Sequence, residues 1–382
     1  MRKLAVIHFN SIEAYPPVMN WLNYLADRSG PALQVRVYTM APASGIKRFV
    51  PASPNIRIIR AGRQGQRQAW VRYLQYLLFY ARTFLGLIGS RPGILLYYES
   101  ISSLPALLYK KYFGRKARLF IHYHEYTSIP EYEQGMSLTR YLHRMEKRQY
   151  ASADWLSQTN DDRIACFTRD LQGVSLPVLR VLPNYPPASW KRPTRNGRAA
   201  GGPLRIVYIG ALSLDTMYTR EFAQWVRRQQ GEVIWDIYTN NLSPDSLAFL
   251  RAEGESFIRF RGATDYFSLP EVLKDYDVGI ILYKGHIPNY VYNAPNKLFE
   301  YLACGLDVWF PDTLRGSYPY VTSGTYPRVM SLDFGALDGF SWQKATDREG
   351  LSLRNPTWYC EDVLVALWRE MTDGPEARSP HK

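Results

Sequence analysis

Strand-length and helix-length apolar segments alternate along the chain, and the alternation occurs twice within its 382 residues. In the first half, hydrophobic periodicity predicts strands at residues 4–7, 33–38, 94–98 and 118–122, and helices at 18–26, 66–87, 104–112 and 138–145. In the second half it predicts strands at 204–210, 234–238, 257–260, 278–283 and 308–310, and helices at 218–229, 269–274 and 293–305. Such alternation is typical of α/β proteins, in which helices cover both faces of a parallel sheet.

A break without periodicity separates the two halves. Residues 183–187 read Pro-Asn-Tyr-Pro-Pro, and residues 191–203 are rich in Arg, Gly and Pro, as linkers are. We therefore expect an N-terminal Rossmann-like domain over 1–185, a linker over 186–203 and a second domain over 204–355. A C-terminal helix and tail over 356–382 can pack back on the N-terminal domain. The chain is long enough for two domains of ordinary size.

The sequence also bears on the compartment. No run of eighteen uncharged apolar residues occurs, so no membrane-spanning helix is expected. The first apolar run, residues 4–7, is too short for the core of a signal peptide. Three cysteines, odd in number and widely spaced, suggest neither a disulfide framework nor a zinc site. These features favour the cytoplasm, with peripheral attachment to the inner face of the cell membrane as a further option.

Positive charge is concentrated in the first half. Residues 1–190 carry 25 Lys and Arg against 11 Asp and Glu, whereas residues 191–382 carry 22 against 23. Between Arg28 and Arg118 there are sixteen basic residues and a single acidic one, Glu99. A cationic surface of this kind implies an anionic partner, which could be a membrane surface, a phosphorylated acceptor or nucleic acid. No known nucleic-acid-binding motif accompanies the charge, which disfavours the last of these.

The helix predicted over residues 66–87 is both aromatic and basic. Aromatic and aliphatic residues recur in it at helical spacing: Trp70, Tyr73, Tyr76, Leu77, Tyr80 and Phe84. Arginines flank this stripe at positions 63, 67, 72 and 82. Two interpretations remain open, a buried amphipathic helix or a helix that contacts anionic lipid.

Residues 293–305 form the predicted helix with the most specific chemistry. A proline lies near its start and a glycine just past its end, and Asn293 or Asn296 could cap it. Lys297 falls in the first turn, where the helix dipole disfavours a cation unless an anion binds there. Glu300, three residues later, lies on the same face and could accept hydrogen bonds from sugar hydroxyls. The segment thus predicts a site for a nucleotide diphosphate and its ribose, the alternative being a surface Lys–Glu pair.

This segment resembles the Pro-Asn-Lys-x-Phe-Glu-Tyr-x-Ala-x-Gly signature of the retaining glycosyltransferases of family 4, the group 1 glycosyl transferases with the GT-B fold. Further stretches resemble other motifs of the family in the same order: residues 122–125, 146, 153–154, 181–187, 206–211, 260–262 and 276–280. The resemblance spans most of residues 90–310. It implies two Rossmann-like domains that face each other across a cleft.

The resemblance also implies roles for individual residues. Glu300 would hold the donor ribose, while Asn296, Lys297 and the start of their helix would hold the diphosphate. A histidine at the end of a first-domain strand would contact the donor sugar; His124 fits this role, with His122 as the alternative and Glu125 beside it. Gly210, after the first strand of the second domain, would allow close backbone approach to the diphosphate, or it is a plain turn glycine.

The chain departs from the family pattern at three positions. Tyr292 replaces an earlier glutamate that usually precedes Glu300 by several residues, and Asp307 replaces a proline. Ala211 follows Gly210 where the family often has a basic residue, so Arg220 is a candidate substitute.

The resemblance implies a glycosyltransferase that moves a sugar from a nucleotide-diphosphate donor to a glycan, a lipid-linked molecule or another acceptor, with retention of configuration. No Asp-x-Asp metal motif occurs, so we expect no metal ion and no other cofactor. Two alternatives remain: a sugar-nucleotide epimerase of the same fold, and a scaffold subunit that has lost activity. The second is suggested by Tyr292 and by the missing basic residue after Gly210.

Overall fold

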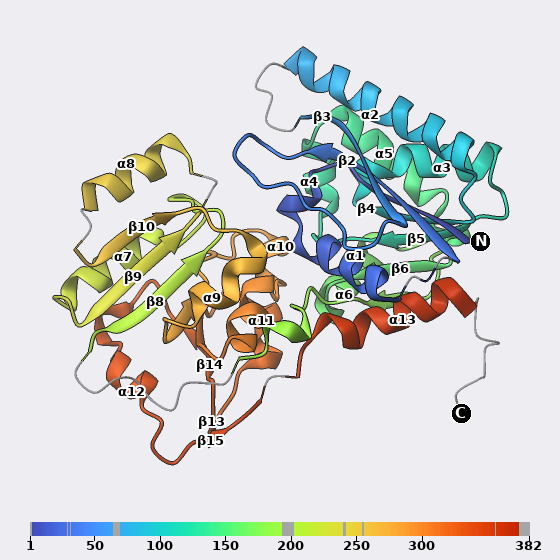
Figure 1. The fold of residues 1–382 in the computed structure, drawn as a ribbon. Helices are drawn as coiled ribbons and strands as arrows, with labels where there is room; N and C mark the ends of the chain where they lie inside the picture. Colours follow the sequence, from blue (N-terminus) through green and yellow to red (C-terminus); the bar gives the residue numbers. More distant parts are fainter. Residues whose placement is uncertain are drawn as a thin grey trace. The chain divides into compact units, whose positions relative to one another are not determined.

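The computed structural model describes residues 2–28, 30, 32–63, 69–192, 202–239, 242–253, 256–355 and 357–373. The chain forms two compact units (Figure 1). The first unit comprises Met1–Asn184 together with the C-terminal segment from Cys360, and the second unit comprises Tyr185–Tyr359.

The first unit is built on a parallel sheet of seven strands in the order β3-β2-β1-β4-β5-β6-β7. The strands are β1 (Arg2–His8), β2 (Leu33–Ala41), β3 (Ile56–Arg63), β4 (Ile94–Tyr98), β5 (Arg118–His122), β6 (Trp155–Gln158) and β7 (Leu179–Val181). The central strands are buried on both faces, as in Ile94–Tyr98, because helices cover both sides of the sheet.

Helices α2 (Ala69–Ser90), α3 (Ser103–Tyr112) and α5 (Ser137–Lys147) cover one face of this sheet, and α1 (Pro16–Arg28) and α13 (Cys360–Asp373) cover the other (Figure 1). The remaining helices are α4 (Ile129–Gln134) and α6 (Asp161–Asp170). Arg118 pairs with Glu370 at 2.7 Å and α13 contacts α1, so the C-terminal helix is part of the first unit.

The second unit is built on a parallel sheet of six strands in the order β10-β9-β8-β11-β12-β14. They are β8 (Leu204–Ile209), β9 (Val233–Tyr238), β10 (Ile258–Gly262), β11 (Val278–Ile280), β12 (Asp307–Pro311) and β14 (Val329–Leu332). β13 (Thr325–Tyr326) and β15 (Ser352–Leu353) form a separate short pair. The helices are α7 (Thr219–Arg228), α8 (Pro244–Glu253), α9 (Leu269–Leu273), α10 (Pro288–Val291), α11 (Asn296–Ala303) and α12 (Trp342–Thr346).

Two apolar layers enclose the second sheet. One contains Phe222, Trp225, Trp235 and Trp309, and the other contains Leu298, Phe299, Tyr301 and Phe310. Both units are therefore Rossmann-like, with helices packed on a parallel sheet, which confirms the predicted fold class.

Six strands were not predicted from the sequence: β3, β6, β7, β13, β14 and β15. Strand β3 lies at the edge of its sheet, and Arg57 and Arg60 interrupt its apolar run. Strands β6 and β7 have four and three residues and include polar ones. The strand predicted over 278–283 ends at Ile280.

The expected linker is partly folded onto the second unit. Trp190 is buried with its ring 4.7 Å from that of Tyr266, and the Arg192 backbone N–H donates to the Ala303 carbonyl at 3.0 Å. Residues 193–201 of that linker, the C-terminal tail over 374–382, and Gln66 and Arg67 at the predicted start of the long helix lie outside the described residues. No helix in the described part of the chain is long and apolar enough to cross a membrane.

Candidate functional site

Helix α11 begins without a side-chain cap. Its N-cap residue is Pro295, and the Leu298 N–H donates to the Pro295 carbonyl at 2.9 Å. The prediction that Asn293 or Asn296 caps the helix is therefore wrong: Asn296 is already inside the first turn, and the Asn293 carbonyl accepts a hydrogen bond from the Ser317 hydroxyl. A helix start without a cap leaves N–H groups that can bind an anion.

The inner face of α11 fixes this start against the sheet. The hydroxyl of Tyr301 accepts a hydrogen bond from the Ile209 backbone N–H at 3.1 Å, at the end of β8. A Cβ atom on Gly279 of β11 would lie only 2.1 Å from the Tyr301 ring, so the close packing requires glycine there. As a result, the first turn of α11 lies at the carboxyl edge of the second sheet, where ligands of α/β proteins bind.

Lys297 lies over this edge between two tyrosines and a glycine. Its Nζ donates to the Tyr283 hydroxyl at 3.0 Å and lies 5.5 Å from the Tyr208 ring centroid. Burial disfavours its charged form, but Tyr283 and Tyr208 raise its pKa overall, so Lys297 is a cation at neutral pH. Gly210 has a φ of +128°, and a Cβ there would lie 2.9 Å from both Cε and Nζ of Lys297. The glycine thus permits a close approach, in this structure to the lysine.

Glu300 is a largely buried carboxylate. Its residue is 6% exposed, its oxygens still reach solvent, and within the described part of the chain no group donates a hydrogen bond to its side chain. Burial raises the pKa of Glu300 to about 7, and Lys297 opposes that rise. The two residues do not form the surface ion pair that was the alternative interpretation, because Lys297 donates to Tyr283 instead. A buried carboxylate of this kind is suited to ligand hydroxyls.

The structure places the other two candidates of the second unit, Tyr292 and Arg220, on different elements. Tyr292 ends α10, and its backbone carbonyl would lie 2.6 Å from a Cβ placed on Gly316, so this segment is tightly packed. Arg220 is exposed on α7, with its guanidinium carbon 5.4 Å from the Phe249 ring centroid of α8. The structure therefore gives Arg220 a place on the α7–α8 surface rather than a contact with Lys297.

In the first unit, a row of polar side chains ends four neighbouring strands. His8, Tyr98, His122 and Ser157 are paired in register across β1, β4, β5 and β6. His124 follows just beyond the end of β5. Its ring stacks on Tyr98 at 4.9 Å and lies 4.6 Å from the ring of His122. The two histidines that the sequence singled out thus lie together at the carboxyl edge of the first sheet.

Hydrogen bonds orient these imidazoles. His8 Nδ1 lies 2.8 Å from the Asn10 carbonyl, His122 Nδ1 lies 2.8 Å from Ser157 Oγ, and His124 Nδ1 lies 3.2 Å from Asn184 Oδ1. A carbonyl only accepts, so His8 carries its proton on Nδ1 and presents Nε2 as an acceptor. The Nε2 atoms of His8 and His124 are buried and have no hydrogen-bond partner among the described residues.

Burial keeps the histidine cluster neutral. It lowers the pKa of His8 to about 4 and that of His122 to about 3, and it lowers the pKa of His124 well below its ordinary value. At neutral pH these rings therefore offer acceptors to a hydroxyl and no positive charge to a phosphate.

Glu99 is a half-buried acid that bonds to the backbone next to the histidine cluster. It has a φ of +60°, and its carboxyl oxygen accepts the backbone N–H groups of His124 at 2.7 Å and Glu125 at 3.3 Å. Burial and the nearby Glu125 raise the pKa of Glu99 to about 8. The Glu125 side chain itself is exposed. Sequence reasoning missed His8, Tyr98 and Glu99; the available signal was their position at the ends of predicted strands.

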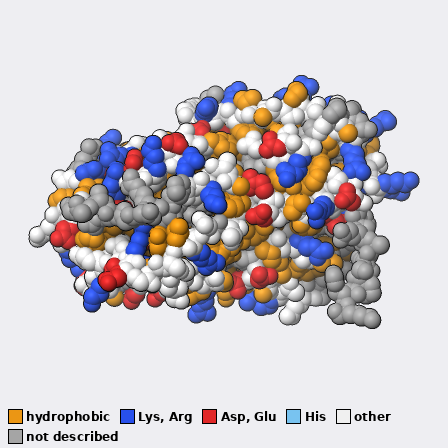
Figure 2. Space-filling view, turned by 60° about the horizontal axis from the view of Figure 1, so that its bottom comes forward, with side chains coloured by type: hydrophobic (Ala, Val, Ile, Leu, Met, Phe, Trp, Pro, Cys, Tyr) orange, Lys and Arg blue, Asp and Glu red, His pale blue; other side chains and the backbone are white. Residues whose placement is uncertain are grey.

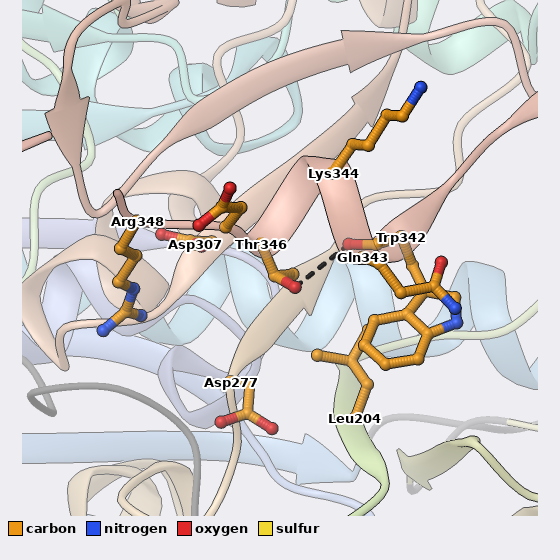
Figure 3. A pocket seen from close by; sticks show the side chains of 9 residues that line it. Leu204, Asp277, Asp307, Trp342, Gln343, Lys344, Thr346 and Arg348 are labelled. Atoms are coloured by element: carbon orange, nitrogen blue, oxygen red, sulfur yellow. Dashed lines mark hydrogen bonds between the residues drawn. The ribbon is translucent and has the colours of Figure 1, made fainter. Parts of the chain in front are cut away.

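A pocket in the second unit lies at the opposite edge of the sheet, beside the starts of β8, β11 and β12 (Figure 3). Asp277 and Asp307 line it, but their carboxylates already accept backbone N–H groups, from Arg205 at 2.9 Å and from Arg328 at 2.6 Å. Their oxygens thus hold strand starts in place, unlike the carboxylate of Glu300. Within the described residues, no group of three or more His, Cys, Asp or Glu side chains is arranged to hold a metal ion.

Comparisons with known proteins identify the fold. No family model matches the chain, and no curated protein matches it. Among solved structures, sucrose-phosphate synthase from Thermosynechococcus elongatus is 15% identical, with a TM-score of 0.71 over 97% of this chain and 99% of that one. The apo form of the lipopolysaccharide outer core galactosyltransferase WaaB is 14% identical, with a TM-score of 0.56 over 97% and 96%.

An enzyme of a different class has a similar fold. UDP-GlcNAc 2-epimerase from Methanocaldococcus jannaschii is 8% identical, with a TM-score of 0.57 over 97% of this chain and all of that one. These similarities extend over both units, and at such identities they report on the fold alone. With its two parallel-sheet Rossmann-like units, the chain therefore has the GT-B fold, which these glycosyltransferase and epimerase structures share.

Proposed function

We propose that this protein is a glycosyltransferase that uses a nucleotide-diphosphate sugar as donor. One observation carries the proposal: Lys297 lies beside Gly210 in the first turn of a helix without a side-chain cap, and one turn later the largely buried carboxylate of Glu300 has no hydrogen-bond donor among the described residues. A diphosphate needs a cation and N–H donors, and a ribose needs an acceptor for its hydroxyls. The first two turns of α11 offer all three.

The proposed reaction breaks the bond between the anomeric carbon of the donor sugar and the diphosphate. The oxygen of an acceptor hydroxyl forms the new bond to that carbon, its proton passes to the leaving phosphate, and the protonated nucleoside diphosphate leaves. Negative charge grows on the leaving diphosphate, so Lys297 and the N–H groups of α11 contribute most in the transition state. By the resemblance noted above, we expect retention of configuration and a glycan or lipid-linked acceptor.

We assign the histidine cluster of the first unit to sugar hydroxyls. His8 and His124 each have a buried Nε2 without a partner, and both rings are neutral. A hydroxyl that donates to His124 would satisfy an otherwise costly buried acceptor. His122 is less suited to this role, because its Nε2 is not among the buried nitrogen atoms that lack a hydrogen-bond partner.

We also propose that the reaction needs no divalent ion, since Lys297 supplies positive charge at the diphosphate. Turnover should then stay nearly unchanged in EDTA. Complete loss on chelation, restored by magnesium or manganese, would show that protein groups alone do not hold the diphosphate.

A sugar-nucleotide epimerase is the second candidate, because the fold is shared with UDP-GlcNAc 2-epimerase. An epimerase would use the same donor site and would need no acceptor. A scaffold without activity is the third, because Tyr292 stands where the related enzymes often have a glutamate.

A donor screen followed by a product assay separates these candidates. Thermal shift with UDP-, GDP-, ADP- and dTDP-sugars identifies the base, and mass spectrometry then follows the bound sugar. Release of nucleoside diphosphate with transfer or hydrolysis supports the glycosyltransferase. A change in the sugar without release indicates an epimerase, and binding without any turnover indicates a scaffold. Failure of every nucleotide sugar to bind would overturn the assignment of Glu300 and Lys297.

A further inference from the structure

Helix α2 is apolar on two sides. Its inner side packs into the core of the first unit: Phe79 and Leu87 are fully buried, and Tyr76, Phe84 and Ile88 lie against them. This side alone explains why the helix belongs to the fold. The stripe predicted from the sequence is split by the structure, because Trp70, Tyr73 and Leu77 point away from that core.

The outer side carries a second apolar row, which we call the outer stripe: Trp70, Tyr73, Leu74, Leu77, Leu78 and Leu85. These residues fall on one side of a helix, at positions i, i+3, i+4, i+7, i+8 and i+15, and are 66%, 52%, 47%, 66%, 55% and 67% exposed. They make up six of the seventeen large hydrophobic side chains that are exposed in the described part of the chain. Large apolar side chains that are exposed together in this way mark a surface that binds a membrane or another protein.

The charges around the outer stripe are of one sign. Arg72 and Arg82 are exposed on α2, and the helix contains no acidic residue. The end of α3 continues the same surface: the rings of Phe84 and Phe113 lie 5.7 Å apart, and Phe113 and Tyr112 are exposed. Lys111, Arg115 and Lys116 are exposed beside them. By contrast, the face in Figure 2 shows acidic and basic side chains side by side.

We propose that the outer stripe inserts into the surface of an anionic lipid bilayer. Leu and aromatic residues on one side of a helix, with Arg and Lys around them, form the pattern of helices that lie in the membrane interface. A nucleic acid would use the arginines but would leave six large apolar side chains in water. The inner side of α2 is fixed to the core, so the helix lies on the bilayer along its length of about 33 Å. The inference does not depend on the proposed function.

The surface can be tested with the purified full chain and vesicles. Sedimentation should show binding to vesicles of phosphatidylcholine with phosphatidylglycerol, and much weaker binding to phosphatidylcholine alone. Binding should fall as salt rises, because the Debye length shrinks to about 3 Å at 1 M. Equal binding to both vesicles, or no binding to either, would overturn the proposal.

Two sets of variants separate the apolar and the charged contributions. Replacing Trp70, Leu77 and Leu85 with Ser should reduce vesicle binding at least about tenfold. Each cation near an anionic surface contributes about fivefold, so Arg72→Gln with Arg82→Gln should reduce it on the order of 25-fold. Arg63 is not used in these variants because its side chain is not described, and Arg67 lies outside the described residues.

Matched controls make the result specific to α2. Val178, Val321 and Leu353 are 56%, 43% and 48% exposed elsewhere, and replacing all three with Ser should leave vesicle binding unchanged. The same holds for Arg251→Gln with Lys344→Gln in the second unit, where both side chains are exposed. All variants should keep the melting temperature of the parent, because the changed side chains are on the surface.

A second copy of the chain is the main competing occupant. If the parent is a dimer in sedimentation velocity without lipid, and the Ser variant of the outer stripe is a monomer, the stripe is an interface between copies and the lipid proposal is wrong. A monomeric parent whose vesicle binding is lost in both α2 variants and kept in both controls would support it.

Discussion

The carboxyl edges of the two sheets differ in the charge and in the hydrogen-bond partners of their polar side chains. In the first unit, three imidazoles lie in ring contact and burial holds them neutral. In the second unit, the half-buried Lys297 keeps its charge and donates a hydrogen bond to the Tyr283 hydroxyl, and no described residue donates to the carboxylate of Glu300. The difference shows that available partners, as well as burial, decide whether such a group is charged. A neutral edge suits hydroxyls, and a charged edge suits a diphosphate with its ribose.

The largest expected effect is the loss of turnover when Lys297 is removed from the charged edge. Lys297→Ala should lower the turnover number roughly 10²- to 10³-fold, because the leaving diphosphate loses its main cation in the transition state. The KM for the donor should change much less. Initial rates over a range of donor concentrations measure both quantities.

Lys274→Ala is the control, since Lys274 is exposed and pairs with Glu271 at 3.2 Å on α9. It should retain the rate of the parent. Equal losses in turnover and in donor affinity for Lys297→Ala would mean that the lysine binds substrate and transition state equally.

Neutralising Glu300 should weaken donor binding rather than chemistry. We expect Glu300→Gln to lower the affinity for the nucleotide sugar about 10- to 100-fold, because a hydrogen bond to a charged group contributes roughly 1.5–3 kcal/mol. Calorimetry with the sugar nucleotide gives this number. An unchanged affinity would mean that Glu300 does not bind the ribose.

The raised pKa of Glu300 adds a dependence on pH with a definite sign. Its pKa in the free protein is raised from the ordinary 4.5 to about 7, so the folded state binds a proton that the unfolded state releases. Stability should therefore fall as the pH rises from about 4.5 to about 7, and Glu300→Gln should lack this loss. Ribose binding needs the carboxylate, so donor affinity should rise from pH 6 to pH 8 in the parent alone.

The sequence predicted the second edge better than the first because its key residues are close together in the chain. Lys297 and Glu300 share one helix, and their spacing places them on one face. Their partners are not local: Tyr283 and Gly210 reach Lys297 only because β8 and β11 are neighbours in the sheet. The helix cap was predicted wrongly because Pro295, with its fixed φ, takes the N-cap position ahead of Asn296.

The first edge depends on register between strands that are far apart in sequence. His8, Tyr98 and His122 come together because β1, β4 and β5 pair with their last residues aligned. Alternation along each strand predicts the sheet but does not give this alignment. The sequence also did not show which apolar residues of α2 are exposed, because helical periodicity does not say which of two apolar sides faces the core.

A methyl group at Gly210 should disturb the second edge to a smaller degree. Gly210→Ala places a Cβ 2.9 Å from Lys297 at a φ of +128°, and such strain costs about 1–3 kcal/mol. We expect a lower melting temperature and a severalfold weaker affinity for the donor, since Lys297 must move. Scanning calorimetry and titration with the sugar nucleotide measure these changes.

Gly89→Ala is the matched control, because nothing lies within 4 Å of a Cβ at that helical position. It should be neutral or stabilise the protein by up to about 1 kcal/mol through helix propensity. If Gly210→Ala behaved in the same way, the close approach to Lys297 would be unimportant.

At neutral pH the smallest expected effect concerns the neutral edge, because the contribution of His8 to stability appears only below about pH 6.5. Burial lowers the pKa of His8 from 6.5 to about 4, so below pH 6.5 the unfolded state binds a proton that the folded state does not. His8 should thus cost the parent stability as the pH falls from 6.5 towards 4, with a slope of at most about 1.4 kcal/mol per pH unit. In His8→Asn this contribution disappears, so its free energy of unfolding, measured by urea titration, should fall less steeply over that range.

Phe9→Leu, a change at the adjacent buried residue without an ionisable group, should lower stability equally at every pH. Parallel curves for the parent and His8→Asn would mean that His8 takes up its proton in the folded state near pH 6.5, and the contrast between a neutral and a charged edge would then fail.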